Sequence, residues 1–252
     1  MSITASFAGH TCNNLFQYAV LRIIAEKNGY DFYIPEDAKT RLREFVDCDM
    51  GCDSFTQKYE WYETPEQKFD PELFNIKDGT YIHGFFQTHK YLKGNWPNIV
   101  NWFYIPQELN DHNVCLIHFR GKDYVGGWNY LPKSYYEKAM AEVSQANPDM
   151  IFKVVTDDPE AAREYFPDKE IQHSTSFLDF QALKSARHLI LSNSSYSCWA
   201  PVLTPYVLTV IAPKRWFNYN KNYDQAGLGK TVENNNDWYP YDMENSFFTF
   251  ID

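Results

Sequence analysis

The sequence lacks several signals that identify common enzyme and binding classes. Its five cysteines (Cys12, Cys48, Cys52, Cys115 and Cys198) form no CxxC pair, so neither a zinc knuckle nor a disulfide framework is indicated, and a reducing compartment fits best. A Walker A motif and a G-x-G-x-x-G after the first strand are both missing, which disfavours ATPases and ordinary NAD-dependent dehydrogenases. There is also no G-x-S-x-G nucleophile elbow.

Basic residues and long apolar runs are scarce. The chain has 23 Lys and Arg against 33 Asp and Glu, a net charge of −10. This balance disfavours nucleic acid as a partner but leaves room for a small anionic ligand. The N-terminus lacks the basic and apolar regions of a signal peptide, and no window approaches the roughly 18 apolar residues of a membrane helix. We therefore expect a soluble, cytoplasmic protein without a membrane span; its oligomeric state is left open.

Aromatic residues, in contrast, are abundant. Phe, Tyr and Trp make up 18% of the 252 residues. This content excludes disorder and provides flat faces that pack in cores and stack on sugars and bases. The length allows one large domain or two small ones.

The second half of the chain alternates between apolar strands and helical stretches. Strands are predicted at 114–119, 151–156, 188–192 and 207–212, and helices at 133–146, 159–165, 176–185 and 195–203. Short apolar strands separated by helices predict a parallel sheet covered on both faces. The polar, proline-containing segment 105–113 marks a boundary before this pattern.

The first half is less regular. A helix is predicted from Leu15 to Gly29, with Asn13 as its cap and Gly29 as its stop, followed by a strand at 31–35. Residues 36–80 show no usable period. A strand is predicted from Thr80 into a turn at 84–86, and a helix at 89–96 that Pro97 closes.

A parallel sheet binds ligands at the carboxyl ends of its strands. Three loops lie there in the predicted second half: 118–127, 156–159 and 192–197. In the first, the planar fork of Arg120 suits phosphate oxygens, and the alternative is a surface ion pair with Asp123. His118 alternates with apolar residues, a pattern more typical of a core histidine than of a catalyst.

The other two loops also allow two interpretations. Asp157 or Asp158 either caps the following helix or accepts hydrogen bonds from a ribose or a base. The hydroxyls and backbone N–H groups of residues 192–197 either cap a helix or receive a phosphate. Asp47 and Asp49 form a D-x-D pattern, but no strand precedes it and we infer no metal from it.

Taken in order, these segments resemble the α-1,2-fucosyltransferase family, glycosyltransferase family 11. The resemblance rests on six segments, from the first near the N-terminus to the last near residue 217. They are 9–19 (GHTCNNLFQYA), 84–91 (GFFQTHKY), 118–124 (HFRGKDY), 156–158 (TDD), 193–199 (NSSYSCW) and 210–217 (VIAPKRWF). The chain departs from the family pattern H-x-R-R-G-D-Y at Gly121 and Lys122, where the family has Arg and Gly.

The resemblance implies an α/β fold of GT-B type, with two Rossmann-like halves and mostly parallel sheets facing a cleft. Residues 1–108 would form an acceptor-side half, and residues 109–215 a half that binds the nucleotide sugar. Residues 216–252 would form a tail that packs back on the N-terminal half. The implied activity is an inverting transfer of fucose from GDP-fucose to a glycan acceptor, with no metal and no cofactor besides the nucleotide sugar. Two alternatives stay open: a xylose, rhamnose or galactose donor, or a non-catalytic protein that binds nucleotides or glycans.

The resemblance also implies roles for individual residues. Arg120 would contact the diphosphate, and Asp123, His118 or His10 are candidates for a general base. Phe86 and Gln87 would bind the acceptor, and Phe85, Trp96 and Trp128 are further candidates for stacking on it. The expected donor-binding residues are Asn13, Arg120, Asp157, Asp158, Asn193, Ser194, Ser195 and Ser197.

Overall fold

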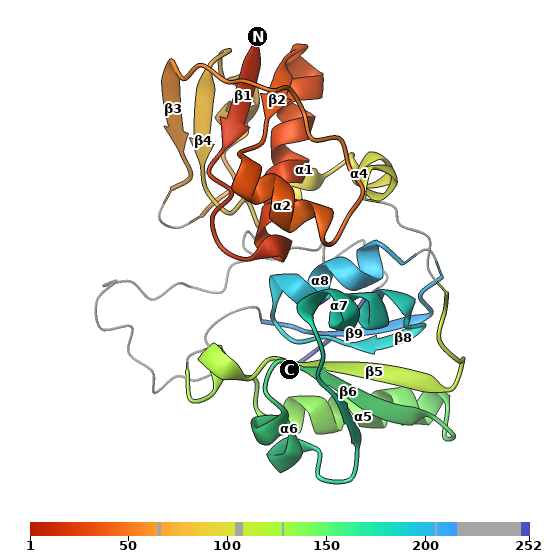
Figure 1. Cartoon of the computed structure of the whole chain (residues 1–252). Helices are drawn as coiled ribbons and strands as arrows, with labels where there is room; N and C mark the ends of the chain where they lie inside the picture. The colour runs from red at the N-terminus through yellow and green to blue at the C-terminus, as the bar shows by residue number, and fades with distance from the viewer. Residues whose placement is uncertain (65–66, 104–107, 128, 205, 216–247) are drawn as a thin grey trace. The chain divides into compact units, whose positions relative to one another are not determined.

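In the computed structural model, the described residues are 1–64, 67–103, 108–127, 129–204, 206–215 and 248–252. They form two compact α/β units, each with its own parallel sheet (Figure 1). The first unit comprises described residues up to 103, and the second comprises those from 108 onward. The predicted α/β class, with two Rossmann-like halves, is confirmed.

The first unit contains a four-stranded sheet in the order β2-β1-β4-β3, and all of its strand pairs are parallel. Its strands are β1 (Ser2–Ala5), β2 (Asp31–Tyr33), β3 (Tyr59–Tyr62) and β4 (Thr80–His83). The chain runs from β1 to β2 on one side and later places β4 on the other side of β1. The first unit therefore has a topological switch point between β1 and β4, where open α/β sheets bind ligands.

Helix α1 (Thr11–Asn28) supplies much of the core of the first unit. Twelve of its residues are buried, and Gly29 ends it in the left-handed region with φ 67°, as predicted. The prediction for its start is wrong, because the helix begins at Thr11 after His10. Asn13 thus lies within the first turn instead of capping it.

The segment without a usable period contains regular structure. It forms α2 (Glu36–Arg43), β3 and the 3-10 helix η1 (Pro71–Asn75). The single helix predicted at 89–96 is instead two short ones, α3 (His89–Leu92) and α4 (Trp96–Trp102). Pro97 lies in the first turn of α4, where its missing N–H costs nothing, so it starts a helix instead of closing one.

The second unit contains a six-stranded sheet in the order β10-β9-β8-β5-β6-β7, again with parallel pairs throughout. The strands are β5 (Val114–Phe119), β6 (Ile151–Thr156), β7 (Glu170–Gln172), β8 (His188–Ile190), β9 (Thr209–Pro213) and β10 (Thr249–Ile251). Here β5 lies between β6 and β8, so the switch point falls between β5 and β8.

Helices cover both faces of this sheet. Figure 1 shows α7 (Ser176–Ser185) and α8 (Ser195–Val202) on one face and α5 (Lys133–Ala146) and α6 (Pro159–Tyr165) on the other. Cys115, Ile117 and Phe119 of β5 are fully buried in a core cluster with Tyr135 and Tyr136 of α5. The alternate residues of β5, including His118, therefore face α7 and α8.

Most predicted elements of the second half have the predicted bounds. The exceptions are β7, β10 and the 3-10 helix η2 (Lys122–Tyr124), which were not predicted, and the ends of β8, α8 and β9, which differ by one to two residues. Residues 216–247 of the predicted tail lie outside the described residues. The last residues of the chain belong to the second unit, where β10 pairs with β9 at the edge of the sheet.

Candidate functional site

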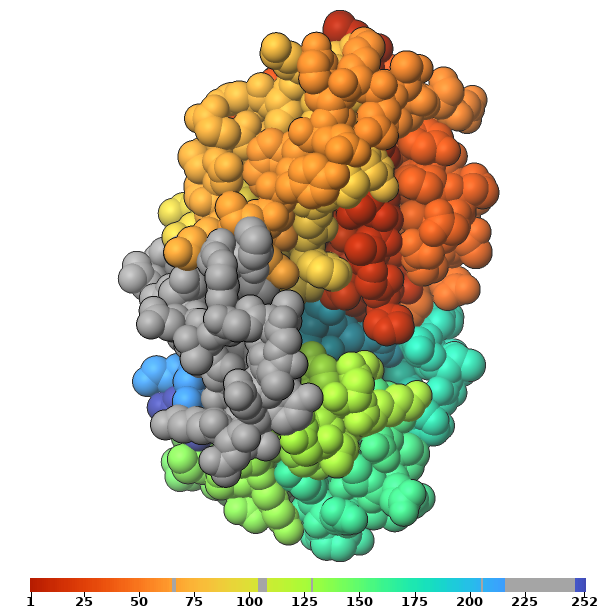
Figure 2. All heavy atoms as spheres, turned by 90° about the vertical axis from the view of Figure 1, so that its left-hand side faces the viewer, coloured from red at the N-terminus to blue at the C-terminus, as the bar shows by residue number. Residues whose placement is uncertain are grey.

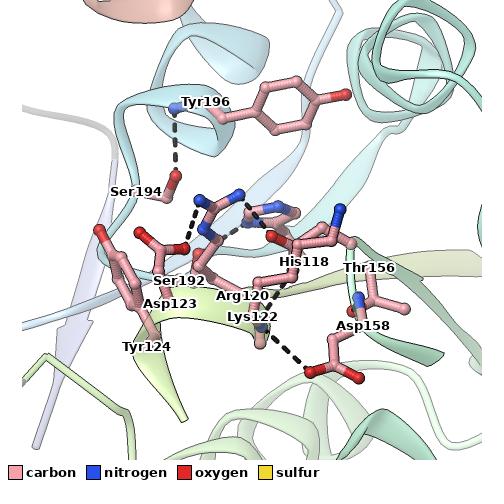
Figure 3. Close-up of polar contacts among 12 residues, drawn as sticks. His118, Arg120, Lys122, Asp123, Tyr124, Thr156, Asp158, Ser192, Ser194 and Tyr196 are labelled. Atoms are coloured by element: carbon pink, nitrogen blue, oxygen red, sulfur yellow. Dashed lines mark hydrogen bonds and ion pairs between the residues drawn. The ribbon is translucent and has the colours of Figure 1, made fainter. Parts of the chain in front are cut away.

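The loops that follow β5, β6 and β8 meet at the carboxyl edge of the second sheet. These three strands are neighbours in the order β8-β5-β6, so side chains from three distant segments come together there (Figure 3). This edge includes the switch point between β5 and β8. The sequence predicts the three loops at strand ends, but not the strand order that makes them neighbours.

Arg120, the first residue after β5, lies at the centre of this group. Its Nη2 donates to Oδ1 of Asp123 at 2.6 Å, and its Nη1 forms an ion pair with Oδ2 of Asp157. Its Cζ lies 5.4 Å from the centre of the Tyr124 ring. The Arg120 side chain is 23% exposed, against 64% for Asp123 and 18% for Asp157. The guanidinium thus pairs with one largely buried carboxylate, Asp157, and with one exposed carboxylate, Asp123. The exposed pair is the weaker of the two, because solvent screens it.

The backbone after Arg120 is tied to the loop after β6. The Gly121 N–H donates to Oδ1 of Asp157 at 2.8 Å, and the Lys122 N–H donates to Oδ2 of Asp158 at 3.1 Å. Asp158 also caps α6, because its Oδ1 accepts from the Ala161 N–H at 3.1 Å. Both aspartates therefore hold the two loops together. Asp158 is also the helix cap, a role that the sequence left open between Asp157 and Asp158.

The backbone is sterically restricted at residues 121 and 122, where the chain departs from the family pattern. A Cβ on Gly121 would lie 2.2 Å from the Asp158 Cβ, so no larger residue fits without a shift of the backbone. Lys122 has a φ of 22°, in the region that favours glycine. The close approach of the two loops accounts for glycine at position 121.

His118 is buried and interacts with the third loop. It is 3% exposed, its Nδ1 lies 2.6 Å from the Ser192 Oγ, and its ring lies 5.3 Å from that of Tyr196. Burial and the nearby charge of Arg120 lower the pKa of His118 to about 3. The imidazole is therefore neutral at physiological pH and a poor proton acceptor, which argues against His118 as the general base.

The third loop uses much of its polarity internally. Ser197 is fully buried, and its Oγ donates to the carbonyl oxygens of Ser192 (3.1 Å) and Ser194 (3.3 Å). Ser194 is the N-cap of α8 and accepts from the Tyr196 N–H. Asn193 is buried and its Nδ2 donates to the Asn129 carbonyl at 2.9 Å. Ser195, the first residue of α8, is only partly buried, so it is the serine of this loop best placed to meet a ligand.

Tyr124 was not singled out by the sequence analysis. Its hydroxyl donates to the Asn193 carbonyl at 3.4 Å, which connects the loop after β5 to the loop after β8. Burial raises the pKa of Tyr124 to about 12. The one signal available from the sequence was its place at the end of segment 118–124.

The loop after β5 is open to solvent. Lys122, Asp123 and Val125 are exposed, and Figure 2 shows this segment, in yellow-green, at the surface of the second unit. Around Arg120 and Lys122 lie three carboxylates, Asp123, Asp157 and Asp158. An anionic ligand that reaches Arg120 would compete with these carboxylates, and the exposed Asp123 is the easiest to displace.

The predicted residues of the first unit lie at its own switch point. Gln87 follows β4, and its Nε2 donates to Oδ1 of Asn13 in the first turn of α1 at 2.8 Å. Phe86 is fully buried and packs against Trp61 and Tyr91. Its ring is therefore not accessible to an acceptor in the arrangement seen here, and its predicted role stays a prediction.

Other expected stacking residues give a mixed result. Phe85 is partly buried, Trp96 begins α4, and Trp128 lies outside the described residues.

Glu63 was not predicted as a site residue, because it lies in the segment without a usable period. Its carboxylate accepts from the turn before Gln87. Within the described residues, no group of three His, Cys, Asp or Glu side chains is placed to hold a metal ion.

The five cysteines are free thiols. None of the described helices combines the length and the apolar character that are needed to cross a bilayer.

Two curated proteins of Escherichia coli are similar to this chain. One is the O-antigen biosynthesis glycosyltransferase WbnK, 25% identical over 189 residues, covering 62% of this chain and 63% of the relative. The other is an alpha-1,2-colitosyltransferase, 26% identical over 182 residues, covering 60% and 63%. The chain thus matches less than two thirds of the length of either relative.

Solved structures with a related arrangement include two described with GDP-fucose. POFUT1 in complex with GDP-fucose is 9% identical, with a TM-score of 0.48 over 83% of this chain and 95% of that one. The NodZ alpha-1,6-fucosyltransferase soaked with GDP-fucose is 12% identical, with a TM-score of 0.48 over 81% and 92%.

A family profile also matches this chain, and it covers a larger share of the chain than either alignment does. The profile described as glycosyl transferase family 11 matches residues 56–230, more than half of the chain. This range contains Gln87, Arg120, Asp157 and the serines of the third loop. The chain belongs to glycosyl transferase family 11.

Proposed function

We propose that this chain is an inverting glycosyltransferase that moves fucose from GDP-fucose to a hydroxyl of a glycan acceptor without a metal. Membership of glycosyl transferase family 11 supports the general activity. Both curated relatives are named as glycosyltransferases, and one of them as an alpha-1,2-linking enzyme.

The position of Arg120 is the observation that carries the proposal. It follows β5 at the switch point between β5 and β8, and the loop after β8 leads into α8. In an inverting transfer, a single displacement at the anomeric carbon leaves negative charge on the nucleotide diphosphate. A preorganised guanidinium and the N–H groups of a helix start stabilise that charge.

The surrounding residues are assigned on the same basis. Ser194 and Ser195 lie at the start of α8, where their N–H and hydroxyl groups would receive the phosphates. Asp157 holds Arg120 and Gly121, and Asp158 holds Lys122 and Ala161. A remaining lone pair of either carboxylate would accept from the ribose or base. Ser197 and His118 are assigned to positioning this loop, and Asp123 remains the candidate for the base.

The acceptor is assigned to the first unit. Gln87 and Asn13 form a hydrogen-bonded pair at the switch point between β1 and β4. Asn13, which the resemblance assigns to the donor, is therefore assigned here to the acceptor together with Gln87. Amide side chains of this type bind sugar hydroxyls both as donors and as acceptors. Their placement at a carboxyl edge of a parallel sheet supports this role.

The donor sugar has a specific alternative. One relative is named a colitosyltransferase, so a donor with a sugar other than fucose is the second candidate. The family resemblance also left open a non-catalytic protein that binds nucleotides or glycans.

A donor panel tests these possibilities. The chain is incubated with GDP-fucose, with GDP-colitose, and with UDP-galactose, UDP-xylose and dTDP-rhamnose, each with a mixture of oligosaccharide acceptors. Free nucleotide is measured, and NMR gives the anomeric configuration of the product. Turnover with GDP-fucose and inversion supports the proposal. Turnover only with another donor would mean that fucose is not the transferred sugar. A thermal shift on nucleotide binding without any turnover would overturn the assignment as an enzyme.

A further inference from the structure

Glu63, which follows β3 in the first unit, has a set of contacts that the proposed site does not use. Its Oε2 accepts hydrogen bonds from two successive backbone N–H groups, Phe85 at 2.8 Å and Phe86 at 3.2 Å. Its Oε1 is buried and has no hydrogen-bond partner among the described residues. One carboxylate oxygen thus fixes two consecutive peptide groups of a turn that lies 22 residues further along the chain.

The turn that Glu63 holds is conformationally demanding. Phe86 has a φ of 54°, a left-handed conformation that non-glycine residues rarely adopt. Its ring is fully buried, 6.1 Å from that of Trp61 and 5.6 Å from that of Tyr91. Such a backbone persists only where its surroundings determine it, and the two hydrogen bonds to Glu63 are the polar part of that constraint.

Gly84 shows how closely Glu63 fits the turn. A Cβ on Gly84 would lie 2.6 Å from the Glu63 Cβ and 2.8 Å from its Oε2. The Gly84 carbonyl accepts from Nε2 of Gln17 in α1 at 2.7 Å. Glycine at position 84 therefore allows both the carboxylate and the helix to hold the turn.

The residue after this turn belongs to the proposed acceptor site. Gln87 donates to Asn13 at 2.8 Å, across the switch point between β1 and β4. The direction of the Gln87 side chain depends on the backbone of Phe85 and Phe86, whose N–H groups Glu63 binds. A chain of direct contacts thus leads from Glu63 through the turn to Gln87 and Asn13.

We propose that Glu63 is a positioning residue, which fixes the turn at residues 84–86 so that Gln87 and Asn13 present their amides to the acceptor sugar. This inference rests on the proposed function. It assigns to Glu63 the role of hydrogen-bond acceptor and not that of general base, because Oε2 is committed to two backbone N–H groups and Oε1 is buried.

Two substitutions separate these roles. Glu63→Gln retains a side-chain oxygen that accepts from both N–H groups, whereas Glu63→Ala removes it. We expect Glu63→Ala to lower kcat/KM for the acceptor about tenfold, the size of a lost hydrogen bond to a charged group. The KM for the nucleotide sugar should stay unchanged. Glu63→Gln should remain within about threefold of the wild type, which is less than 1 kcal/mol by the same conversion.

The matched control is Glu60→Gln, a change at an exposed carboxylate on β3 that bonds to Gln57 and Tyr62. It should leave both constants unchanged. The proposal is overturned if Glu63→Gln loses as much activity as Glu63→Ala, which is the result for a base, or if Glu63→Ala behaves as the wild type. Because Glu63→Ala can also destabilise the unit, Gly84→Ala provides a second route to the same displacement of the turn, with the same acceptor-specific loss expected.

A double-mutant cycle tests whether Glu63 acts through Gln87. If it does, Glu63→Ala combined with Gln87→Ala is no worse than Gln87→Ala alone; additive losses overturn the proposal. Amide hydrogen exchange of Phe85 and Phe86 gives a readout without turnover. Exchange should be faster in Glu63→Ala and retained in Glu63→Gln. If the wild type transfers no sugar but the exchange behaves in this way, the proposed function fails while the hold of Glu63 on the turn stands.

Discussion

Gly121 approaches Asp158 so closely that a Cβ at residue 121 would lie 2.2 Å from the Asp158 Cβ. Two loops that follow neighbouring strands, β5 and β6, meet at this point, with the Gly121 backbone against the Asp158 side chain. The same contact is secured by N–H groups of residues 121 and 122, which donate to Asp157 and Asp158. The position of Arg120 is thus set by a glycine and two carboxylates.

Gly121→Ala should destabilise the second unit. The added methyl group must displace Asp158 or the loop, at a cost of about 1–3 kcal/mol for an overpacked site. Thermal unfolding should show a lower Tm, while Val125→Ala, an exposed position in the same loop, should not. An unchanged Tm for Gly121→Ala would show that the loops separate without cost.

Arg120→Ala should lower the rate of sugar transfer by about 100-fold, the typical loss for one preorganised donor to a developing charge. The fold should be retained, because Arg120 is at the edge of the sheet and partly exposed. Steady-state kinetics measure the loss, and circular dichroism checks the fold. Lys122→Ala is the control, since that side chain is exposed. Turnover close to normal in Arg120→Ala removes Arg120 from the site.

Asp123→Asn should tighten the binding of GDP. The substitution removes the exposed carboxylate that pairs with Arg120, and an exposed ion pair is worth about 0.2–1 kcal/mol, or up to about fivefold in Kd. Isothermal titration with GDP measures the effect. Weaker binding would mean that Asp123 orients Arg120 instead of competing with the ligand. A large loss of kcat alongside tighter binding would identify Asp123 as the base.

His118 should make the protein sensitive to acid. Burial lowers its pKa in the folded state from the ordinary 6.5 to about 3, so the unfolded chain binds a proton first as the pH falls. The free energy of unfolding is unaffected by His118 above pH 6.5 and decreases below it, by about 3 kcal/mol between pH 7 and pH 4. Urea unfolding at several pH values should show a shallower decline in His118→Asn. An equal slope in both proteins contradicts the lowered pKa.

Ser197→Ala should reduce stability without affecting nucleotide binding. The hydroxyl is buried and donates to carbonyl groups of its own loop, and loss of such a hydrogen bond costs about 1 kcal/mol. The Kd for GDP should be unchanged, whereas Ser195→Ala, at the partly buried start of α8, should weaken it. Weaker GDP binding in Ser197→Ala would return Ser197 to the donor-binding set.

The second half of the chain was largely predictable. The bounds of β5, α5, β6, α6 and α7 follow from compact apolar runs and caps such as Asp158, because strands buried on both faces need uninterrupted apolar side chains. The first half was not. Strand β3 has the sequence YEWY and is exposed at three of its four residues, so it carries little of the apolar signal on which a prediction depends.

The same division applies to the site. The positions of Arg120, Asp157 and Ser194 at strand ends were apparent from the sequence, since loops at the carboxyl edge follow from the order of elements. The pairing of Asn13 with Gln87, the burial of Phe86 and the hold of Glu63 on its turn were not. Each joins residues more than 20 positions apart or depends on packing by other segments.

What the sequence determined by itself is the α/β class, the parallel second sheet and the family, because periodicity and ordered motifs are local properties of the chain. Only the tertiary structure decided which polar groups are committed to the protein and which stay available. His118 contacts Ser192, and Asn193 donates to the Asn129 carbonyl, because distant segments surround both side chains. Burial and hydrogen-bond partners are set by residues distant in sequence, and a local pattern carries no record of them.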